Sequence, residues 1–458
     1  DVLDILRTEL NERIPTALKD EEGPWKLLGY LEEVQPSMVF EAEGIRTPSY
    51  TVHLMVDELT RRLGNNTDNE NLRSKLLDLA GEAIKAENEH ILGSTRSLME
   101  KTEETIDQFR SERLESLDIF FDGLETAQGE EGVPQRRPME LLEELSNLVR
   151  TPLRLPSDEL RALPDADEDV KSKIADQISR ALNFLAISRI IGAIERRLDE
   201  SLNIKAADLQ DLDWSEVTES IQMQVEKILD KRSESLMSAS GQISQNIDNI
   251  LNRTTEADVS ENRMVDLLLG MSTGTKLAID PRTHQRGLKR VLLINYIFIA
   301  ARLLQDEPAA VVTQDVLEHL EMIQERQEVV WGKIEFERFR LSGNPLQNLE
   351  SGIQNALAEK LGEEEFSKLI QSQPEVLDGE QREALETILG RRVQNQIHRH
   401  ILLSVISELW VDYLTRVDAL RVSIGLEAYA QRDPLVQYKS RATEMFQTLL
   451  ADVRLATI

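Results

Sequence analysis

The stretch ELWVDYLTRVDALRVSIGLEAYAQRDPLVQYKSRATEMFQTLL, residues 408–450, contains two helical patterns with a turn signal between them. A first apolar stripe, which begins just upstream, recurs at steps of three or four residues: Leu402, Ile406, Leu409, Tyr413, Val417, Leu420 and Ile424. A second stripe follows the turn: Tyr438, Ala442, Met445, Leu449 and Val453. Because each stripe lies on one side of a helix, the pattern predicts two amphipathic helices that pack against each other.

The connector between these helices is predicted to run from Gly425 to Asp433. Asp433-Pro434 is a strong helix start, since aspartate caps free N–H groups and proline is pre-set for the first helical turn. A connector this short favours antiparallel packing of its two helices. Tyr429 lies within it, and two roles are open: it folds back onto the core of the hairpin, or it projects toward a partner. A ring with a polar tip suits both.

The amino-acid composition argues against some partners and excludes some kinds of site. The 458 residues carry 83 acidic and 53 basic side chains, for a formal net charge of −30. We therefore expect no nucleic-acid partner, because phosphate binding needs clustered Lys and Arg. The absence of cysteine excludes disulfides, thiolate zinc sites and cysteine nucleophiles, and it fits a cytosolic protein. The chain starts at Asp1 without a signal-peptide pattern, so both an excised domain and a stand-alone protein are open.

Helix signals dominate the rest of the chain and strand signals are scarce. Helices are expected to end near Arg150, to begin near Val170, to span about Trp214–Asn252 with Asp213 or Ser215 as a cap, and to lie near Gln285–Gln305. We predict an all-α fold, an elongated multi-helix bundle of long amphipathic helices and helical hairpins that ends in a two-helix finger. The predicted regions are an N-terminal helical region with a long coiled-coil-like helix, a linker, a central helical region, and a scaffold with the finger: residues 1–126, 127–169, 170–375 and 376–458. The apolar run from Val291 to Ala301 is too short to span a membrane, so a buried core helix is expected there. The coiled-coil pattern from about Asn71 to Glu125 also permits a homodimer.

Motifs for catalysis or metal binding are not found. A phosphate loop needs G-x-x-x-x-G-K-[ST], and the nearest string, GMSTGTKLAI from Gly270, has the wrong spacing. DADED at Asp165–Asp169 lacks the glycine of a calcium loop. His398 and His400 are two residues apart, so they do not share a helix face. The sequence predicts no catalytic residue, no metal site, no cofactor and no enzyme activity for this chain alone.

The hairpin also resembles the C-terminal scaffold segment of the SecA preprotein translocase family. The matching positions are Leu409-Trp410, Asp418, Leu420-Arg421, Ile424, Leu426, the block Tyr429-Ala430-Gln431 with Asp433-Pro434, Tyr438-Lys439 and Met445-Phe446. Tyr413, Glu427-Ala428 and Gln437 depart from the family's usual histidine, arginine–glycine and glutamate, so the turn is less basic here. Near the N-terminus, ILRTELNERIPTALKDEEGPWKLLGYLEEV is similar to the start of the family's helical wing, with Trp25 and Leu27-Leu28 at the matching places.

This resemblance implies a role and a set of residues. Tyr429, Gln431 and Arg432 would form a fingertip that contacts the translocating chain. Trp410, Asp418, Leu420, Arg421, Asp433, Pro434, Tyr438 and Phe446 would be structural. The chain would be the wing and scaffold portion of a SecA-like translocase, with an expanded wing. It would couple ATP-driven motion to an unfolded preprotein, and the helix from Leu385 to Ile424 would be the transmitting rod.

The partners that the resemblance implies are the SecA-type nucleotide-binding domains, the protein-conducting channel of the membrane and the unfolded preprotein. The expected location is cytoplasmic, peripheral to the inner face of the membrane. One alternative stays open, a helical adaptor or regulatory protein that binds partner helices and has no transport role.

Overall fold

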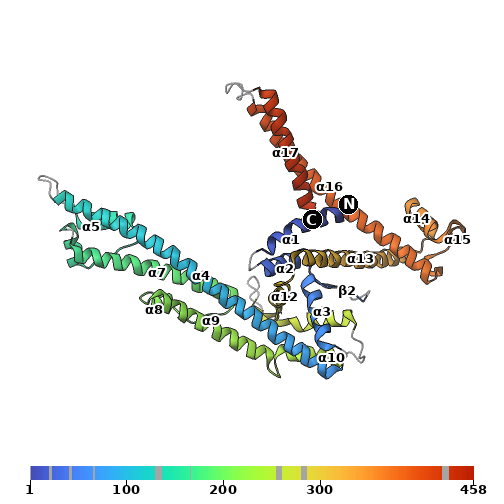
Figure 1. The fold of residues 1–458 in the computed structure, drawn as a ribbon, viewed down its shortest axis with the longest axis horizontal. Coiled ribbons are helices and arrows are strands. Elements are labelled where there is room, and N and C mark those ends of the chain that lie inside the picture. Colours follow the sequence, from blue (N-terminus) through green and yellow to red (C-terminus); the bar gives the residue numbers. More distant parts are fainter. Residues whose placement is uncertain are drawn as a thin grey trace. The chain divides into compact units, whose positions relative to one another are not determined.

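The computed structural model describes residues 2–19, 23–40, 44–64, 68–128, 137–165, 167–253, 260–279, 286–424 and 433–457. Helices dominate these residues, which confirms the all-α class (Figure 1). Packing divides the chain into two units. The first comprises Asp1–Leu76, Ile250–Ser272 and Tyr296–Ile458, and the second comprises Leu77–Asn249 and Thr273–Asn295. No described helix combines the length and the apolar character needed to cross a membrane.

The first unit consists mainly of helices. Its helices are α1 (Val2–Ala17), α2 (Gly23–Val34), α3 (Tyr50–Leu63), α11 (Glu261–Ser272), α12 (Ile297–Leu304), α13 (Ala309–Leu341), α14 (Ser351–Leu361), α15 (Glu363–Leu369), α16 (Gly379–Ser423) and α17 (Pro434–Thr457). A small antiparallel ladder pairs β1 (Met38–Phe40) with β2 (Ile45–Thr47). Ser49 starts α3, because its hydroxyl accepts from the backbone N–H of Val52 at 3.3 Å.

Two glycines allow α13 and α16 to cross at close range. A Cβ added at Gly332 would lie 2.2 Å from the carbonyl oxygen of Glu386, and one added at Gly390 would lie 2.1 Å from that of Glu328. The two backbones therefore touch where any other residue would hold them apart. Beside the crossing, α13, α14, α15 and α16 bury a shared apolar core that includes Phe336, Leu346, Ile353, Leu357, Leu385 and Leu389. This crossing fixes the N-terminal part of α16 to the rest of the scaffold.

A buried polar cluster lies between α2, α3 and α13. His319 is only 2% exposed, and its Nε2–H donates to Gln35 Oε1 at 3.1 Å. The ring of His53 stacks at 4.9 Å and that of Tyr50 packs edge-on at 5.5 Å. Burial, together with the nearby charge of His53, lowers the pKa of His319 to about 3. His319 is therefore neutral in the folded chain at neutral pH.

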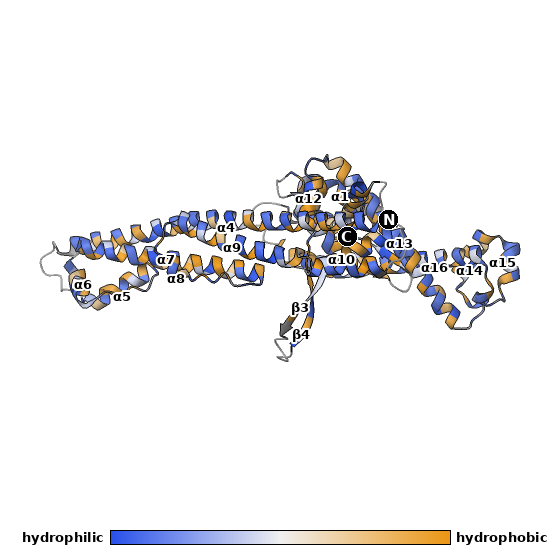
Figure 2. Cartoon of the chain, turned by 90° about the horizontal axis from the view of Figure 1, so that it is seen from below, coloured by the Kyte–Doolittle hydropathy of each residue, from blue (hydrophilic) through white to orange (hydrophobic). Residues whose placement is uncertain are grey.

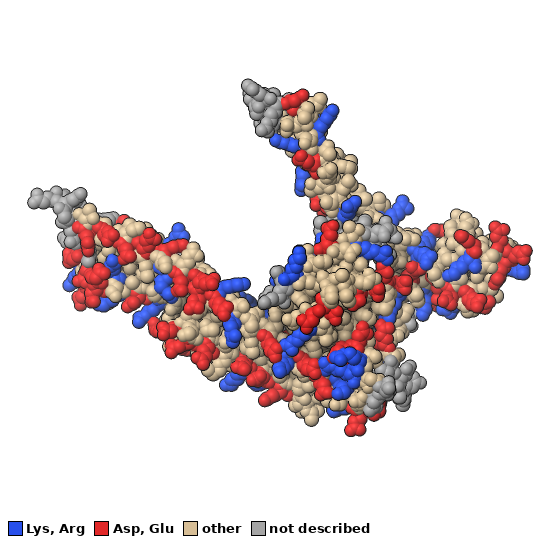
Figure 3. Space-filling view, viewed as in Figure 1, with Lys and Arg blue, Asp and Glu red and all other residues tan. Residues whose placement is uncertain are grey.

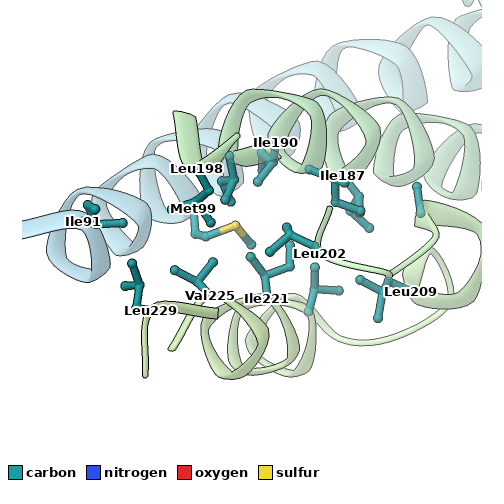
Figure 4. Close-up of a cluster of buried hydrophobic side chains, with 14 residues drawn as sticks. Ile91, Met99, Ile187, Ile190, Leu198, Leu202, Leu209, Ile221, Val225 and Leu229 are labelled. Carbon is teal, nitrogen blue, oxygen red and sulfur yellow. The ribbon is translucent and has the colours of Figure 1, made fainter. Parts of the chain in front are cut away.

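The second unit is a helical arm. It contains most of α4 (Asn69–Gln128), α5 (Pro138–Leu148), α6 (Ser157–Ala162), α7 (Glu168–Leu198), α8 (Ala206–Leu209), α9 (Trp214–Met237), most of α10 (Gln242–Arg253), and the strands β3 (Thr273–Ile279) and β4 (Arg286–Leu292). Side chains from α4, α7 and α9 interdigitate around Met99, Ile187 and Ile221 (Figure 4). The indole N–H of Trp214 donates to the carbonyl oxygen of Met99 at 3.2 Å, which fixes the start of α9 against α4.

Three sequence predictions for this part of the chain need correction. The helix expected near Gln285–Gln305 is instead β4 followed by α12, so the core helix expected over Val291–Ala301 is a strand at its start. The single helix expected from Trp214 to Asn252 breaks at residues 238–241, where Gly241 and two serines favour helix less than alanine does. The linker expected over 127–169 contains α6 in addition to α5, the short helix expected to end near Arg150.

Other predictions are confirmed. The long helix expected from Asn71 to Glu125 is α4, and the helix expected to begin near Val170 is α7. Asp213 caps α9 through a capping box with Glu216. The helix expected from Leu385 to Ile424 is part of α16 (Gly379–Ser423), and Ile424 is the C-cap of that helix.

Candidate functional site, a two-helix hairpin

The helices α16 and α17 form the predicted hairpin, and each begins at an aspartate. Asp378 Oδ1 accepts from the backbone N–H of Gln381 at 2.9 Å, and the Gln381 side chain accepts from the Asp378 N–H at 3.1 Å. Asp433 Oδ1 accepts from the N–H of Leu435 at 2.9 Å, and Pro434 is the first residue of α17. The helix start predicted at Asp433-Pro434 is confirmed.

The two helices pack antiparallel, with α17 running back along the C-terminal half of α16 (Figure 1). Tyr413 of α16 meets Phe446 of α17 edge-on, with ring centroids 6.0 Å apart. Leu449 is the most deeply buried side chain of the contact, at 7% exposed. The residues of both predicted stripes are half-buried or buried, with one exception: Ile406 is 42% exposed, and Val405 turns inward instead.

One side of this hairpin remains apolar and open, and we call it the aromatic face. Trp410 contacts Tyr413 at 5.3 Å, and Tyr413 contacts Phe446, so the three rings follow one another across the hairpin. Trp410 and Phe446 are nevertheless 43% and 41% exposed. Exposed aliphatic side chains one or two helical turns away extend this face: Leu403, Ile406 and Leu414 on α16, and Leu450 on α17. Contiguous exposed apolar surface of this kind marks a protein-interaction site.

The remaining motif residues lie within the two helices of the hairpin. Asp418 and Arg421 form an exposed ion pair at 2.8 Å, one turn apart on α16. Leu420 and Tyr438 are half-buried within the two stripes. Tyr429, Gln431 and Arg432, the fingertip residues, lie outside the described residues, so their contacts stay a prediction.

A groove between α14 and α16 was not anticipated from the sequence. It measures about 580 Å³, and Ile353, Ala356 and Ile388 are among the apolar residues that line it. Cationic side chains also line it, namely Lys360, Arg391, Arg392 and Arg399. Arg392 pairs with Glu350, and Arg391 pairs with Glu328 at 3.2 Å. The basic spacing on α16 was visible in the sequence, but α14, which completes the groove, was not predicted to lie beside it.

The chemistry available at the hairpin is that of a binding surface. Within the described ranges, no three histidine or carboxylate side chains gather in a way that could hold a metal ion. Acidic side chains are spread over the surface, with smaller groups of basic ones between them (Figure 3). The hairpin offers long packed helices, an open aromatic face and ion pairs, which suit docking and the transmission of movement.

Parts of the chain are similar to known proteins. The family model of the SecA Wing and Scaffold domain matches residues 213–458. The protein translocase subunit SecA of Symbiobacterium thermophilum is 35% identical over 109 residues, which cover 24% of this chain and 12% of that relative. The SecA subunit of Pelotomaculum thermopropionicum is 44% identical over 72 residues, which cover 16% of this chain and 8% of that relative. No solved structure matches the chain.

The matched region includes α9, α13 and both helices of the hairpin, and it is more than half of the chain. The aligned segments span only a small part of the length of the translocase subunits. The chain belongs to the SecA wing and scaffold domain family.

Proposed function

We propose that this chain is the non-catalytic helical portion of a SecA-like protein translocase. In this role it couples an ATPase motor, which is not part of this chain, to the movement of an unfolded preprotein through a membrane channel. The observation that carries the proposal is the match of the family to residues 213–458 together with the paired helices α16 and α17.

The geometry of α16 supports a transmitting role. Its 45 residues span roughly 70 Å at 1.5 Å per residue, without an interior proline. One end is held by the glycine crossing with α13, and the other is stiffened by α17. A displacement applied near the crossing would therefore reach the far end of the hairpin with little loss to bending.

The aromatic face supports contact with further protein. Trp410 and Phe446 would lose water-exposed apolar surface on docking, which is a favourable term of about 25 cal/mol per Å². We assign this face to the nucleotide-binding domains of the translocase, and the fingertip around Tyr429 to the preprotein at the channel mouth. The expected location is cytoplasmic, at the inner face of the membrane.

Replacing Tyr429 by alanine in the complete translocase is expected to slow preprotein transport on the order of tenfold, the equivalent of one good side-chain contact. The reason is that the proposed fingertip loses the aromatic ring that contacts the preprotein. Transport of a model preprotein into membrane vesicles, with ATP supplied, measures the effect.

A matched control replaces Tyr30 by alanine, because Tyr30 lies on α2 and is 39% exposed. That variant is expected to transport at the unaltered rate. If Tyr429→Ala transports as well as Tyr30→Ala, the fingertip assignment is wrong.

A further inference from the structure

The β3–β4 hairpin is a two-stranded ribbon that projects from the helices of its own unit (Figure 2). Its root is anchored to α10: the Asn246 side chain donates to the carbonyl oxygen of Thr273 at 2.8 Å. Beyond the root, the strands pair over seven residues each, from Thr273↔Leu292 to Ile279↔Arg286. A two-stranded ribbon is marginally stable in water when nothing covers it. The exposed surface of the projecting ribbon is therefore a candidate for contact with a partner.

The ribbon exposes an apolar pair. Leu277 and Leu288 are direct cross-strand partners, and they are 67% and 73% exposed. Partners in a ladder share one face of the ribbon, and residues two positions away share it as well. Arg286 and Arg290 thus occupy the same face as the leucine pair, one on either side of it. The result is two leucines bracketed by two arginines.

Charge on the ribbon is opposite to that of the chain. Across the described strand residues, TGTKLAI and RGLKRVL, there is no carboxylate, although the chain carries a net charge of −30. The opposite face adds Lys276 and Lys289, which are also cross-strand partners, and Lys276 pairs with Asp199 at 2.8 Å. A cavity of about 530 Å³ at the root adds cations from α7 and α9, with two carboxylates among them: Arg197, Lys231, Arg232, Asp199 and Glu200.

We propose that the β3–β4 hairpin binds the surface of an anionic phospholipid bilayer. Leu277 and Leu288 enter the boundary between headgroups and acyl chains, while Arg286 and Arg290, on the same face, bind headgroup phosphates. Aliphatic side chains gain free energy by leaving water, and each cation near an anionic surface adds attraction. The planar guanidinium of arginine also matches phosphate geometry.

Nucleic acid fits this ribbon less well. Single-stranded nucleic acid is bound through aromatic side chains that stack on bases, and the described strand residues contain no aromatic side chain. Phosphate contacts would use the cations but would leave Leu277 and Leu288 in water. A bilayer can bury the leucine pair and can also bind the cationic side chains through its headgroups. The leucine pair therefore favours a bilayer over nucleic acid. The proposal concerns a surface outside the finger and stands independently of the translocase function.

Vesicle binding of the full chain tests this proposal. The chain has no cysteine, so Leu288→Cys places a single environment-sensitive fluorophore on the ribbon. The label is expected to shift to the blue with vesicles of equimolar phosphatidylcholine and phosphatidylglycerol, and not with phosphatidylcholine alone. A control label at Leu185→Cys, on α7 and 50% exposed, is expected to show no shift. Added salt should weaken the response.

Cosedimentation with vesicles then measures the contribution of the leucines and that of the cations separately. Leu277→Ser with Leu288→Ser, and Arg286→Gln with Arg290→Gln, should each weaken binding to the anionic vesicles on the order of tenfold or more. The control pairs are Leu185→Ser with Met223→Ser, and Arg161→Gln with Lys205→Gln, all at exposed positions of the same unit. Circular dichroism checks that each variant is folded.

Two results would overturn the proposal: no binding of the unaltered chain to anionic vesicles, or binding that the ribbon variants and the controls weaken equally. Ribbon-dependent binding of RNA without binding of vesicles would also overturn it, and would assign the surface to nucleic acid. Because these assays contain neither ATP nor preprotein, failure here would leave the fingertip role of Tyr429 untouched.

Discussion

Gly390→Leu is expected to destabilise the scaffold by about 3 kcal/mol or more, because the new side chain has no room at the crossing of α13 and α16. Even the first added carbon would lie 2.1 Å from the carbonyl oxygen of Glu328 and 3.1 Å from the backbone nitrogen of Gly332. These atoms belong to a helix backbone, so they cannot move aside as a flexible side chain would. The two helices must separate, and the apolar core beside the crossing would open with them.

Urea unfolding followed by circular dichroism measures this effect as a lower transition midpoint. The urea midpoint of Gly390→Ala should lie between those of Gly390→Leu and the unaltered chain. Alanine favours helix by about 1 kcal/mol over glycine, but its Cβ still meets the carbonyl oxygen of Glu328. Gly352→Ala is the matched control, because Gly352 lies on α14 of the same unit and an added Cβ there meets nothing within 4 Å. Equal midpoints for Gly390→Leu and the unaltered chain would show that the helices do not cross this closely.

His319 is expected to make folding less favourable as the solution is acidified. Its pKa is lowered to about 3 in the folded chain, against 6.5 for an exposed histidine, because burial penalises the charged ring. Below pH 6.5 the unfolded chain takes up a proton that the folded chain does not. The stabilisation is thus complete above pH 6.5 and is lost as the pH falls toward 3. Between pH 7 and pH 5 the expected loss is about 2 kcal/mol, at about 1.4 kcal/mol per pH unit.

The measurement compares the free energy of unfolding at the two pH values in the unaltered chain and in His319→Gln. Glutamine does not titrate, and its amide can still donate toward Gln35. Other titrating groups contribute to both proteins, so the difference between their pH slopes isolates His319. If His319→Gln loses as much stability on acidification as the unaltered chain, the histidine is not buried in the neutral form.

The hairpin could be predicted from the sequence because its determinants are local. The stripes follow the helical period, and Asp433-Pro434 marks a helix start through its own side chain and ring. The crossing at Gly332 and Gly390 could not be predicted, because a glycine within a helical pattern does not say which distant helix approaches it. Ile406 fits the period of its stripe, yet the helix presents Val405 inward, since the rotation of α16 is set by α17.

The ribbon of β3 and β4 was missed for a different reason. Residues 291–301 form an apolar run that only Asn295 interrupts, and a run of this length predicts a buried helix when its length alone is considered. Neither RGLKRVL nor its partner TGTKLAI alternates strictly between apolar and polar residues, so neither segment alone carries a clear strand signal. Pairing between the two segments, rather than the propensity of either one, decides the structure here.

The most direct test of the translocase assignment is photocrosslinking from position 429. A photoreactive amino acid replaces Tyr429 in the complete translocase, a preprotein is stalled in transit, and the adducts are identified. The same amino acid at Tyr30 provides the control. The account predicts adducts to the preprotein or to the membrane channel from position 429 and none from position 30. Adducts from position 429 that lie only within the chain would contradict it, and would mean that Tyr429 covers the core of its own hairpin.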